Sequence, residues 1–144
     1  MNALDTIQIQ LETSTATGSC HQNTLPLLHE ITHALRRLQL EQTATIIDLG
    51  AIPFGPGDEQ RLLDFLGRGE VSAKLEAMGD SNIWESRYAG VWIVEHRSTS
   101  GERVAFQIEV TKLPRILEAQ PEDIEESLSM LQASLENLQA GDSV

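Results

Sequence analysis

Two histidines and a glutamate in the segment HEITH, residues 29–33, have the types and spacing of a zinc-binding motif. In an H-E-x-x-H helix, the two histidines lie one turn apart and hold the metal, while the glutamate acts as a general base in hydrolysis. A zinc-dependent hydrolase that uses His29, Glu30 and His33 is therefore one hypothesis for this chain. Such a site also needs a third protein ligand and a shielded cavity.

The helix that must position this motif favours a different interpretation. Residues 25–41 are predicted to be helical, because Asn23 or Thr24 can cap them and apolar residues recur at helical spacing, namely Leu28, Ile31, Leu35 and Leu38. On a wheel of about 100° per residue, the histidines fall on the opposite side, together with Arg36 and Arg37. Because a solvent-exposed face beside two guanidinium groups suits a dication poorly, we predict no metal site and no cofactor, with the zinc hydrolase as the alternative.

The other residues with chemical potential do not form a recognisable catalytic group. Cys20 is the only cysteine, which excludes an internal disulfide and a self-contained cysteine-based zinc or iron–sulfur site. Asp48 follows a predicted strand, where a turn or capping role is the simpler interpretation. The glycine-rich stretch at 54–59 lacks the Lys-Ser/Thr pair of a phosphate-binding loop. We therefore predict no catalytic residue and a protein that is not an enzyme.

The composition narrows the classes of partner. The chain has 144 residues and a net charge of −12, so its surface repels phosphate backbones and nucleic acid is an unfavourable ligand. No apolar run approaches the ~20 residues of a membrane span. The first residues lack the basic and apolar regions of a signal peptide. The expectation is a cytoplasmic protein with neither a nucleic-acid nor a membrane partner.

The order of elements predicts an α+β fold, an antiparallel meander of about four or five strands with helices packed on one face. Strands are expected at 6–12, 43–48, 70–77, in two halves of 83–98 about Ala89-Gly90, and at 103–110, with turns at 79–82 and 99–102. Helices are expected at 25–41, at 58–67 and from Pro121 onward. We predict a flexible segment at 1–23, one domain at 24–138 and a frayed tail at 139–144.

Several short motifs, in a fixed order, resemble one known family. They are IDL at 47–49, P-x-x-P-x-D at 53–58, LGRGEVSA at 66–73, GVW-x-V at 90–94, IEV at 108–110 and PEDI at 121–124. Together they make the chain similar to the C-terminal domain of the HupH/HyaF-type hydrogenase expression/formation proteins over about residues 24–135. The resemblance implies a chaperone in nickel–iron hydrogenase maturation that binds a hydrogenase subunit, and the expected client is the iron–sulfur small subunit.

The motifs also suggest which residues contact a partner. The GRGEV and YAGVW segments are the best candidates, with Gly67, Arg68, Gly69, Glu70, Tyr88 and Trp92 as the predicted partner-binding residues. The glycines could equally shape turns, and Trp92 could equally fill the core. Alternation in 91–96 places Trp92 and Val94 on one face of a strand and Val91, Ile93 and Glu95 on the other.

The last helix adds a second candidate surface. Its acidic residues Glu122, Glu125 and Glu126 have no Lys or Arg among residues 117–138 to balance them. We expect this acidic face to steer a basic client surface, with an attraction that weakens as salt increases. A generic interaction module that only shares the fold is a further alternative. Self-association into a homodimer and contacts with other maturation factors are left open.

Overall fold

The computed structural model describes residues 23–142. They divide into two compact units, the first ending at Lys112 and the second beginning at Leu113. The predicted flexible segment at 1–23, with Cys20 and the predicted strand at 6–12, lies outside the described residues except for Asn23. Whether 24–138 folds as one domain stays a prediction.

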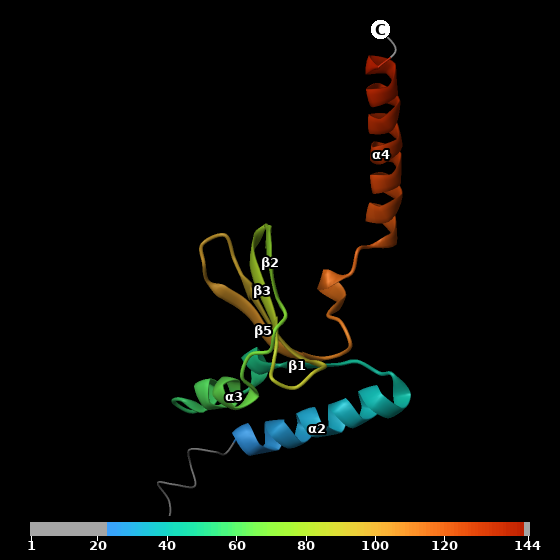
Figure 1. Cartoon of the computed structure of the whole chain (residues 1–144). Coiled ribbons are helices and arrows are strands. Elements are labelled where there is room, and N and C mark those ends of the chain that lie inside the picture. Colours follow the sequence, from blue (N-terminus) through green and yellow to red (C-terminus); the bar gives the residue numbers. More distant parts are fainter. Residues whose placement is uncertain (1–22, 143–144) are drawn as a thin grey trace, which may run out of the picture. The chain divides into compact units, whose positions relative to one another are not determined.

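The first unit is built on a five-stranded antiparallel sheet, which confirms the predicted fold class (Figure 1). Four strands follow one another as a meander, each paired with the next: β2 (Ser72–Ala77), β3 (Gly79–Glu85), β4 (Val91–Arg97) and β5 (Arg103–Val110). The earlier strand β1 (Thr45–Asp48) pairs with β5, so the order across the sheet is β1-β5-β4-β3-β2. Short turns join the meander, as antiparallel strands allow.

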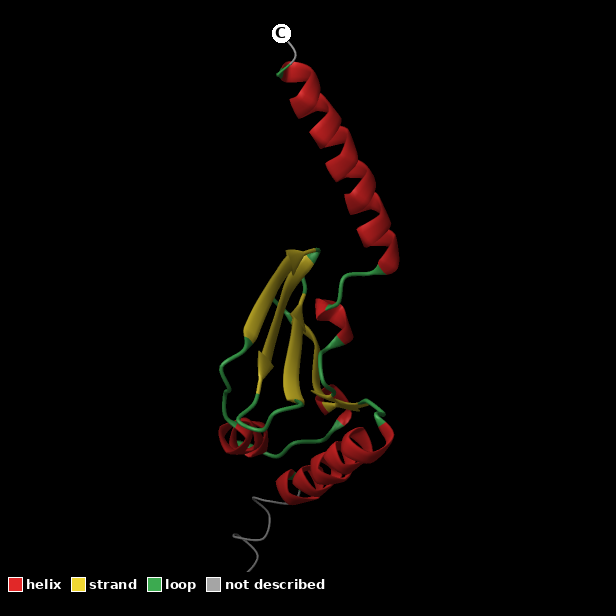
Figure 2. Ribbon diagram, turned by 45° about the vertical axis from the view of Figure 1, so that its right-hand side comes forward, coloured by secondary structure: helices red, strands yellow, loops and turns green. Residues whose placement is uncertain are grey.

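Two helices lie at the lower end of the sheet in Figure 2, and their apolar residues pack against one face of it. They are α2 (Thr24–Glu41) and α3 (Asp58–Leu66), with the short 3-10 turn η2 (Leu49–Ala51) between them in the chain. Their apolar residues Leu27, Ile31, Ala34, Leu62 and Leu66 join a buried cluster with the strand residues Val91, Ile93, Phe106, Ile108 and Val110. Burying such side chains is the main stabilising contribution to a fold of this size.

One predicted turn is wrong. Residues 79–82, GDSN, were expected to form a turn because Gly, Asp, Ser and Asn favour turns. They instead begin β3, and the chain reverses at Met78, between the paired residues Ala77 and Gly79. Gly79 has a φ of +119°, and a Cβ there would lie 2.1 Å from the carbonyl oxygen of Arg97. The glycine therefore serves a tight hairpin one residue earlier than its polar neighbours suggested.

Strand β4 lies at the centre of the unit and is buried on both faces. Val91 and Ile93 lie on one face, as the alternation predicted, and belong to the main cluster with the helix residues. Trp92 and Val94 on the other face are also buried, and Val94 is paired with the buried Ile83 of β3. A strand that is apolar on both sides needs cover on both sides, which explains its run of four apolar residues.

The second unit consists of the 3-10 turn η3 (Arg115–Leu117) and the helix α4 (Pro121–Gly141). Pro121 occupies the first helical turn, where its missing N–H costs nothing. The helix continues to Gly141, although a frayed tail was expected from residue 139. Among the described helices, none is both long enough and apolar enough to cross a bilayer.

Candidate partner-binding site

Two motifs that are separate in the sequence lie against each other. The segment after α3, residues 67–69, runs beside the turn that joins β3 to β4, residues 85–90. The N–H of Gly69 donates to the carbonyl oxygen of Glu85 at 2.8 Å, and the N–H of Arg87 donates to that of Leu66 at 2.8 Å. The structure therefore brings the LGRGE segment against residues 85–87, directly before YAGVW, although their sequence positions alone give no reason to expect it.

The glycines in this contact have structural reasons to be glycine. A Cβ on Gly69 would lie 2.6 Å from the carbonyl oxygen of Ser86, closer than side-chain carbons come to backbone oxygens. Gly67 ends α3 with a φ of +64° and lies under the guanidinium group of Arg87. Both positions fit the role of shaping the turn, which the sequence left open beside a binding role.

The 85–90 turn is held by its own hydrogen bonds. The buried Ser86 hydroxyl accepts the N–H of Tyr88 at 3.1 Å and donates to the carbonyl oxygen of the same residue at 3.0 Å. A carboxylate oxygen of Glu85 accepts the N–H of Gly90. These bonds fix the position from which the Tyr88 side chain projects.

An apolar groove runs between α2 and α3 toward this turn. It consists of two adjoining hollows of about 250 and 350 Å³, which share Leu28 and Phe65. The larger hollow is also lined by Thr24, Leu25 and Arg61, and the smaller by Ile31, Thr32, Leu35, Leu66, Tyr88 and Val91. Leu25, Phe65 and Tyr88 are 58%, 52% and 40% exposed, so the groove presents apolar surface directly to solvent.

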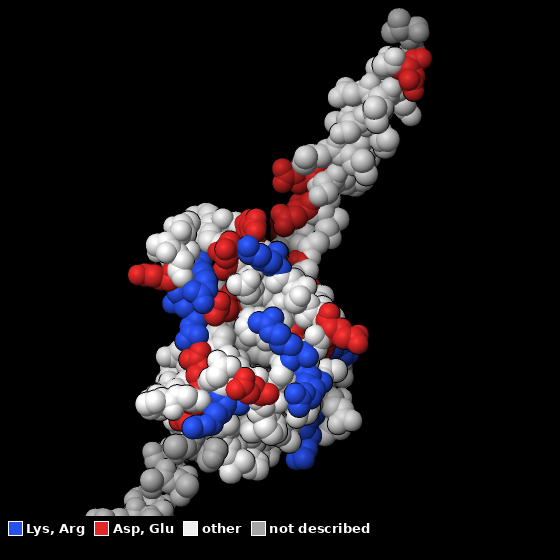
Figure 3. All heavy atoms as spheres, turned by 60° about the vertical axis from the view of Figure 1, so that its left-hand side comes forward, with Lys and Arg blue, Asp and Glu red and all other residues white. Residues whose placement is uncertain are grey.

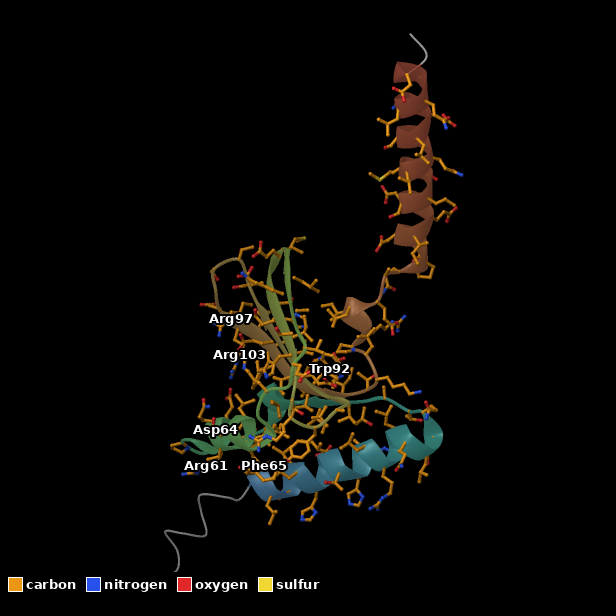
Figure 4. All side chains as sticks on the ribbon, viewed as in Figure 1. Arg61, Asp64, Phe65, Trp92, Arg97 and Arg103 are labelled. Atoms are coloured by element: carbon orange, nitrogen blue, oxygen red, sulfur yellow. The ribbon has the colours of Figure 1, made fainter. Side chains whose placement is uncertain are left out.

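Two aromatic rings form one wall of the groove. The rings of Phe65 on α3 and Tyr88 in the turn are stacked, with centroids 6.1 Å apart and planes inclined by 17°. Figure 4 shows Phe65 pointing from α3 toward α2. Large, rigid aromatic side chains that stay partly exposed are the groups that most often anchor a protein partner. The apolar groove is therefore the best candidate site in the described residues.

Comparison with known proteins gives the family of this chain. The HupH hydrogenase expression protein profile, C-terminal conserved region, matches residues 21–138. The chain belongs to this family. Both segments that form the motif contact, 66–73 and 85–90, fall within the matched region, which confirms the family resemblance drawn from the motifs.

Individual relatives agree with the HupH assignment. The hydrogenase expression/formation protein HoxQ of Azotobacter vinelandii is 30% identical over 119 residues, which are 81% of this chain and 42% of the relative. HupH of Rhizobium leguminosarum bv. viciae is 27% identical, over 76% of this chain and 39% of that protein. The chain therefore spans less than half the length of these curated relatives.

A solved structure shows the same fold in the HupH family. The hydrogenase expression protein HupH from Thiobacillus denitrificans ATCC 25259 superposes with a TM-score of 0.78 at 36% identity. The match covers 80% of this chain and 96% of that one. This level of identity supports the architecture and the family assignment together.

A second, polar groove lies on the part of the sheet face that the helices leave uncovered. It has a volume of about 510 Å³ and is lined by residues of β2, β3 and β4, with Arg68 and Trp84 at one side. The guanidinium carbon of Arg68 lies 4.4 Å from the centre of the Trp84 ring, a cation–π contact. The predicted residue Arg68 is therefore held in place at the rim between the motif contact and this groove.

Charged side chains of the first unit form ion pairs, and one of these pairs includes Lys74, which lines the polar groove. Arg103 donates two hydrogen bonds to the carboxylate of Glu59, one of them 3.1 Å long, and this pairing raises the pKa of Arg103. The hydrogen bond to Glu76 raises the pKa of Lys74. On the side drawn in Figure 3, blue and red groups alternate over this unit. An anion that approached Lys74 in the polar groove would have to compete with the carboxylate of Glu76.

The remaining predicted residues lie in different places. Trp92 is only 4% exposed, and its indole N–H donates to the carbonyl oxygen of Thr111 at 3.1 Å, so a direct contact with a partner would require it to become exposed. Glu70 is exposed and follows the motif contact. Glu122, Glu125 and Glu126 are exposed on α4, in the other unit. The binding roles of these residues stay predictions.

The zinc motif lies on the outer face of α2. His29, Glu30 and His33 are all exposed, on the side opposite the buried Leu27, Ile31 and Ala34. Among residues 23–142, no group of three or more His, Cys, Asp or Glu side chains is arranged to hold a metal ion. The wheel therefore placed the histidines correctly. Its expected core stripe contained Leu28 and Leu35, whereas the preceding residues Leu27 and Ala34 are the buried ones.

Sequence reasoning missed Phe65, an exposed aromatic member of the apolar groove. Phe65 is one residue before the buried Leu66 and three after the buried Leu62, so it lies at the edge of the apolar stripe of α3. An aromatic side chain beside, rather than within, a helix's core stripe is a signal of exposed binding surface. Leu25, in the first turn of α2, carries a similar signal.

Proposed function

We propose that this chain is an accessory protein of nickel–iron hydrogenase maturation that binds an immature hydrogenase subunit and performs no catalysis itself. Its membership of the HupH family supports the role in maturation, as do the names of relatives described as hydrogenase expression/formation proteins. The apolar groove supports a binding role, because exposed apolar hollows lined by aromatic rings are suited to cover a partner's apolar segment.

One observation carries the proposal. Leu25, Phe65 and Tyr88 remain exposed around an apolar groove whose end is formed by the two family motif segments. A protein with no partner gains nothing by leaving two stacked rings half in water, since burying each would contribute on the order of 1.5–3 kcal/mol. The groove is therefore the place where an apolar client segment binds.

The client is the iron–sulfur small subunit before it joins the large subunit, as the family resemblance implies. Its apolar segment occupies the groove, and the rim residues Arg68 and Glu70 contact polar groups beside that segment. Gly67 and Gly69 hold the rim in place through their contacts with the 85–90 turn. The acidic residues Glu122, Glu125 and Glu126 steer a basic part of the client, which makes association faster at low salt.

The alternatives predict different behaviour. A zinc-dependent hydrolase would bind stoichiometric zinc through His29 and His33, and no arrangement of the described residues favours it. A generic interaction module would use the same apolar groove for clients unrelated to hydrogenase. The two hydrogenase subunits therefore have to be tested side by side with unrelated proteins.

The test measures binding of separately produced small and large subunit precursors to the wild-type chain and to Phe65→Ala/Tyr88→Ala. We expect the small subunit to bind the wild type. The double variant should lose at least about tenfold in affinity, because a few aromatic anchors contribute most of the binding free energy of such interfaces. The matched control is Leu40→Ala, which removes a 72%-exposed apolar side chain of α2 outside the groove.

Each outcome decides between the hypotheses. Equal binding by wild type and double variant would reject the apolar groove as the site. Equal capture of unrelated proteins would favour the generic module. A further variant with Glu122, Glu125 and Glu126 changed to Gln tests the acidic residues, which are rejected as steering groups if the association rate is unchanged at low salt.

A further inference from the structure

The helix α4 carries an apolar seam that its own unit does not cover. Successive apolar residues are separated by four, three, four and three positions, namely Ile124, Leu128, Leu131, Leu135 and Leu138. This is the a/d spacing of a coiled-coil heptad, with Leu128 and Leu135 at a and the other three at d. All five are exposed, from 49% for Leu135 to 69% for Leu138.

The width of the seam indicates the kind of surface that covers it. A helix that packs against a sheet needs a broad apolar stripe, whereas a strict a/d seam is narrow and fits the seam of another helix. In α2, which does pack on the sheet, apolar contacts extend over Leu27, Leu28 and Ile31 in one turn. In α4, only the a/d line is apolar apart from Met130, Ala133 and Ala140. A second helix is therefore the partner that this spacing fits.

The residues beside the seam indicate which helix this is. The positions that flank an a/d seam, e and g, select a partner by charge when they are acidic or basic. In α4 they are Glu125, Ser127, Gln132, Ser134, Gln139 and Gly141, so five of the six are uncharged. The other acidic residues lie at the outer positions b, c and f. Because these flanking positions are mostly uncharged, they select no partner of opposite charge, and the helix is suited to pair with its own copy.

We propose that α4 pairs with α4 of a second copy of this chain as an antiparallel coiled coil. In an antiparallel pair, a residues face d residues of the other helix, and the spacing of α4 gives a register with four complete layers. Ile124 faces the copy's Leu135, Leu128 faces its Leu131, and the two-fold axis repeats both layers. Leu138 then lies beside the copy's Pro121.

The distribution of charge sets the orientation. Glu122, Asp123, Glu125 and Glu126 lie in the first six residues of α4, while Glu136 is the only acidic residue of its last fifteen. A parallel pair would place two such acidic clusters side by side, where like charges repel. The antiparallel pair places each acidic half against a half whose only acidic residue is Glu136. Ser127 of one helix then lies near Ser134 of the copy, and the small size of both residues allows the helices to approach closely.

The first experiment measures the oligomeric state of the whole chain by light scattering and sedimentation over a range of concentrations. We expect a monomer–dimer equilibrium, and we expect Leu128→Ala/Leu131→Ala to raise its dissociation constant at least about 100-fold, since four seam side chains per dimer are lost. Alanine is chosen because it is the best helix former and does not itself unwind α4. A wild type that is monomeric at every concentration would overturn the proposal.

The matched control is Met130→Ala. Met130 is 63% exposed on the same helix but lies at the outer position c, so its removal should leave the dissociation constant within about twofold. Loss of the dimer in this control as well as in the seam variant would show that general apolar surface, not the seam, is responsible. A dimer that survives the seam variant would place the interface elsewhere and reject the proposal.

The second experiment tests the orientation with spin labels in a Cys20→Ser background. Single cysteines replace Ser129 or Glu136, which are one heptad apart and both at position b. The antiparallel register places position 129 level with its copy, and position 136 about 20 Å along the axis from its copy. The label-to-label distance should therefore be clearly longer at 136. Equal distances at both positions would indicate a parallel pair and overturn the orientation.

This inference stands apart from the proposed function. It concerns α4 alone, whereas client binding is assigned to the groove between α2 and α3. Phe65→Ala/Tyr88→Ala should leave the dimer intact, and Leu128→Ala/Leu131→Ala should leave the groove intact. Failure of one proposal is therefore visible separately from failure of the other.

Discussion

Helices α2 and α4 have similar lengths and clear apolar stripes, yet they lie in different environments. In α2, Leu27, Ile31 and Ala34 are buried against the sheet, and its neighbouring leucines pack at the edge of the same cluster. In α4, none of the described residues is buried. The difference teaches that helical periodicity identifies an apolar face, while the width of that face indicates what covers it.

The two helices also differ in charge. The unit that contains α2 has basic and acidic side chains over its surface, several of them in ion pairs. The residues from 113 onward contain seven acidic residues and only one basic residue, Arg115. The first unit therefore has internal electrostatic partners, whereas α4 depends on solvent, salt or a partner to offset its charge.

The largest expected difference between the two units concerns leucine removal. Leu62→Ala should lower the free energy of unfolding of the first unit by about 2–5 kcal/mol, because Leu62 is fully buried and its loss leaves a cavity. Leu131→Ala, on the exposed seam, should change the same quantity by less than about 0.5 kcal/mol. Urea unfolding followed by the fluorescence of Trp84 and Trp92 measures both variants, since both tryptophans lie in the first unit.

The measurement should be made at a protein concentration where the wild type is monomeric, so that dimer dissociation does not contribute. A loss above about 2 kcal/mol in Leu131→Ala would mean that α4 is part of the same folding unit, and the contrast with α2 would fail.

The second comparison uses glycine-to-alanine changes. Gly69→Ala should destabilise the first unit by about 1–3 kcal/mol, because its Cβ would meet the carbonyl oxygen of Ser86 at 2.6 Å and force the motif contact apart. Gly141→Ala at the end of α4 meets nothing within 4 Å and replaces a poor helix former, so it should not destabilise. Thermal unfolding by circular dichroism gives both values. Equal destabilisation by the two variants would mean that the short contact with the Ser86 carbonyl oxygen is not the reason for glycine at position 69.

These contrasts show where sequence reasoning was sufficient and where it was not. Alternation and turn residues predicted an antiparallel meander of about four or five strands, because neighbouring strands in a meander pair locally. The pairing of β1 with β5, which are far apart in the chain, is set by tertiary structure. The turn at GDSN was wrong because a single glycine with positive φ, Gly79, decided the hairpin more strongly than polar composition. The apolar groove was missed because Leu25, Phe65 and Tyr88 come from three separate elements, and only tertiary packing brings them together.

A smaller effect is expected from the ion pairs of the first unit. Glu59→Gln removes the carboxylate that Arg103 contacts through two hydrogen bonds, while both side chains are about a third exposed. We expect a loss of up to about 1 kcal/mol at low salt, reduced at high salt. The measurement is urea unfolding at two salt concentrations. A loss that does not depend on salt would indicate that packing of Arg103 over Phe106, rather than charge, is responsible.

The smallest effect should have the opposite sign, because α4 lacks basic partners. Glu122 and Glu126 are four residues apart and repel each other, so Glu126→Gln should stabilise the helix by about 0.2–0.5 kcal/mol. Glu122→Gln relieves the same repulsion but also removes a negative charge from the first turn, where the helix dipole favours it by about 0.3–1 kcal/mol, so it should give no gain.

Far-UV circular dichroism at low salt compares the two variants in the Leu128→Ala/Leu131→Ala background, which removes pairing between copies. Because both effects arise from exposed charges, they should fade toward 1 M salt, where the Debye length falls to about 3 Å. A gain in helicity from Glu122→Gln equal to that from Glu126→Gln would show that repulsion along α4 outweighs its dipole, and that the acidic first turn does not stabilise the helix.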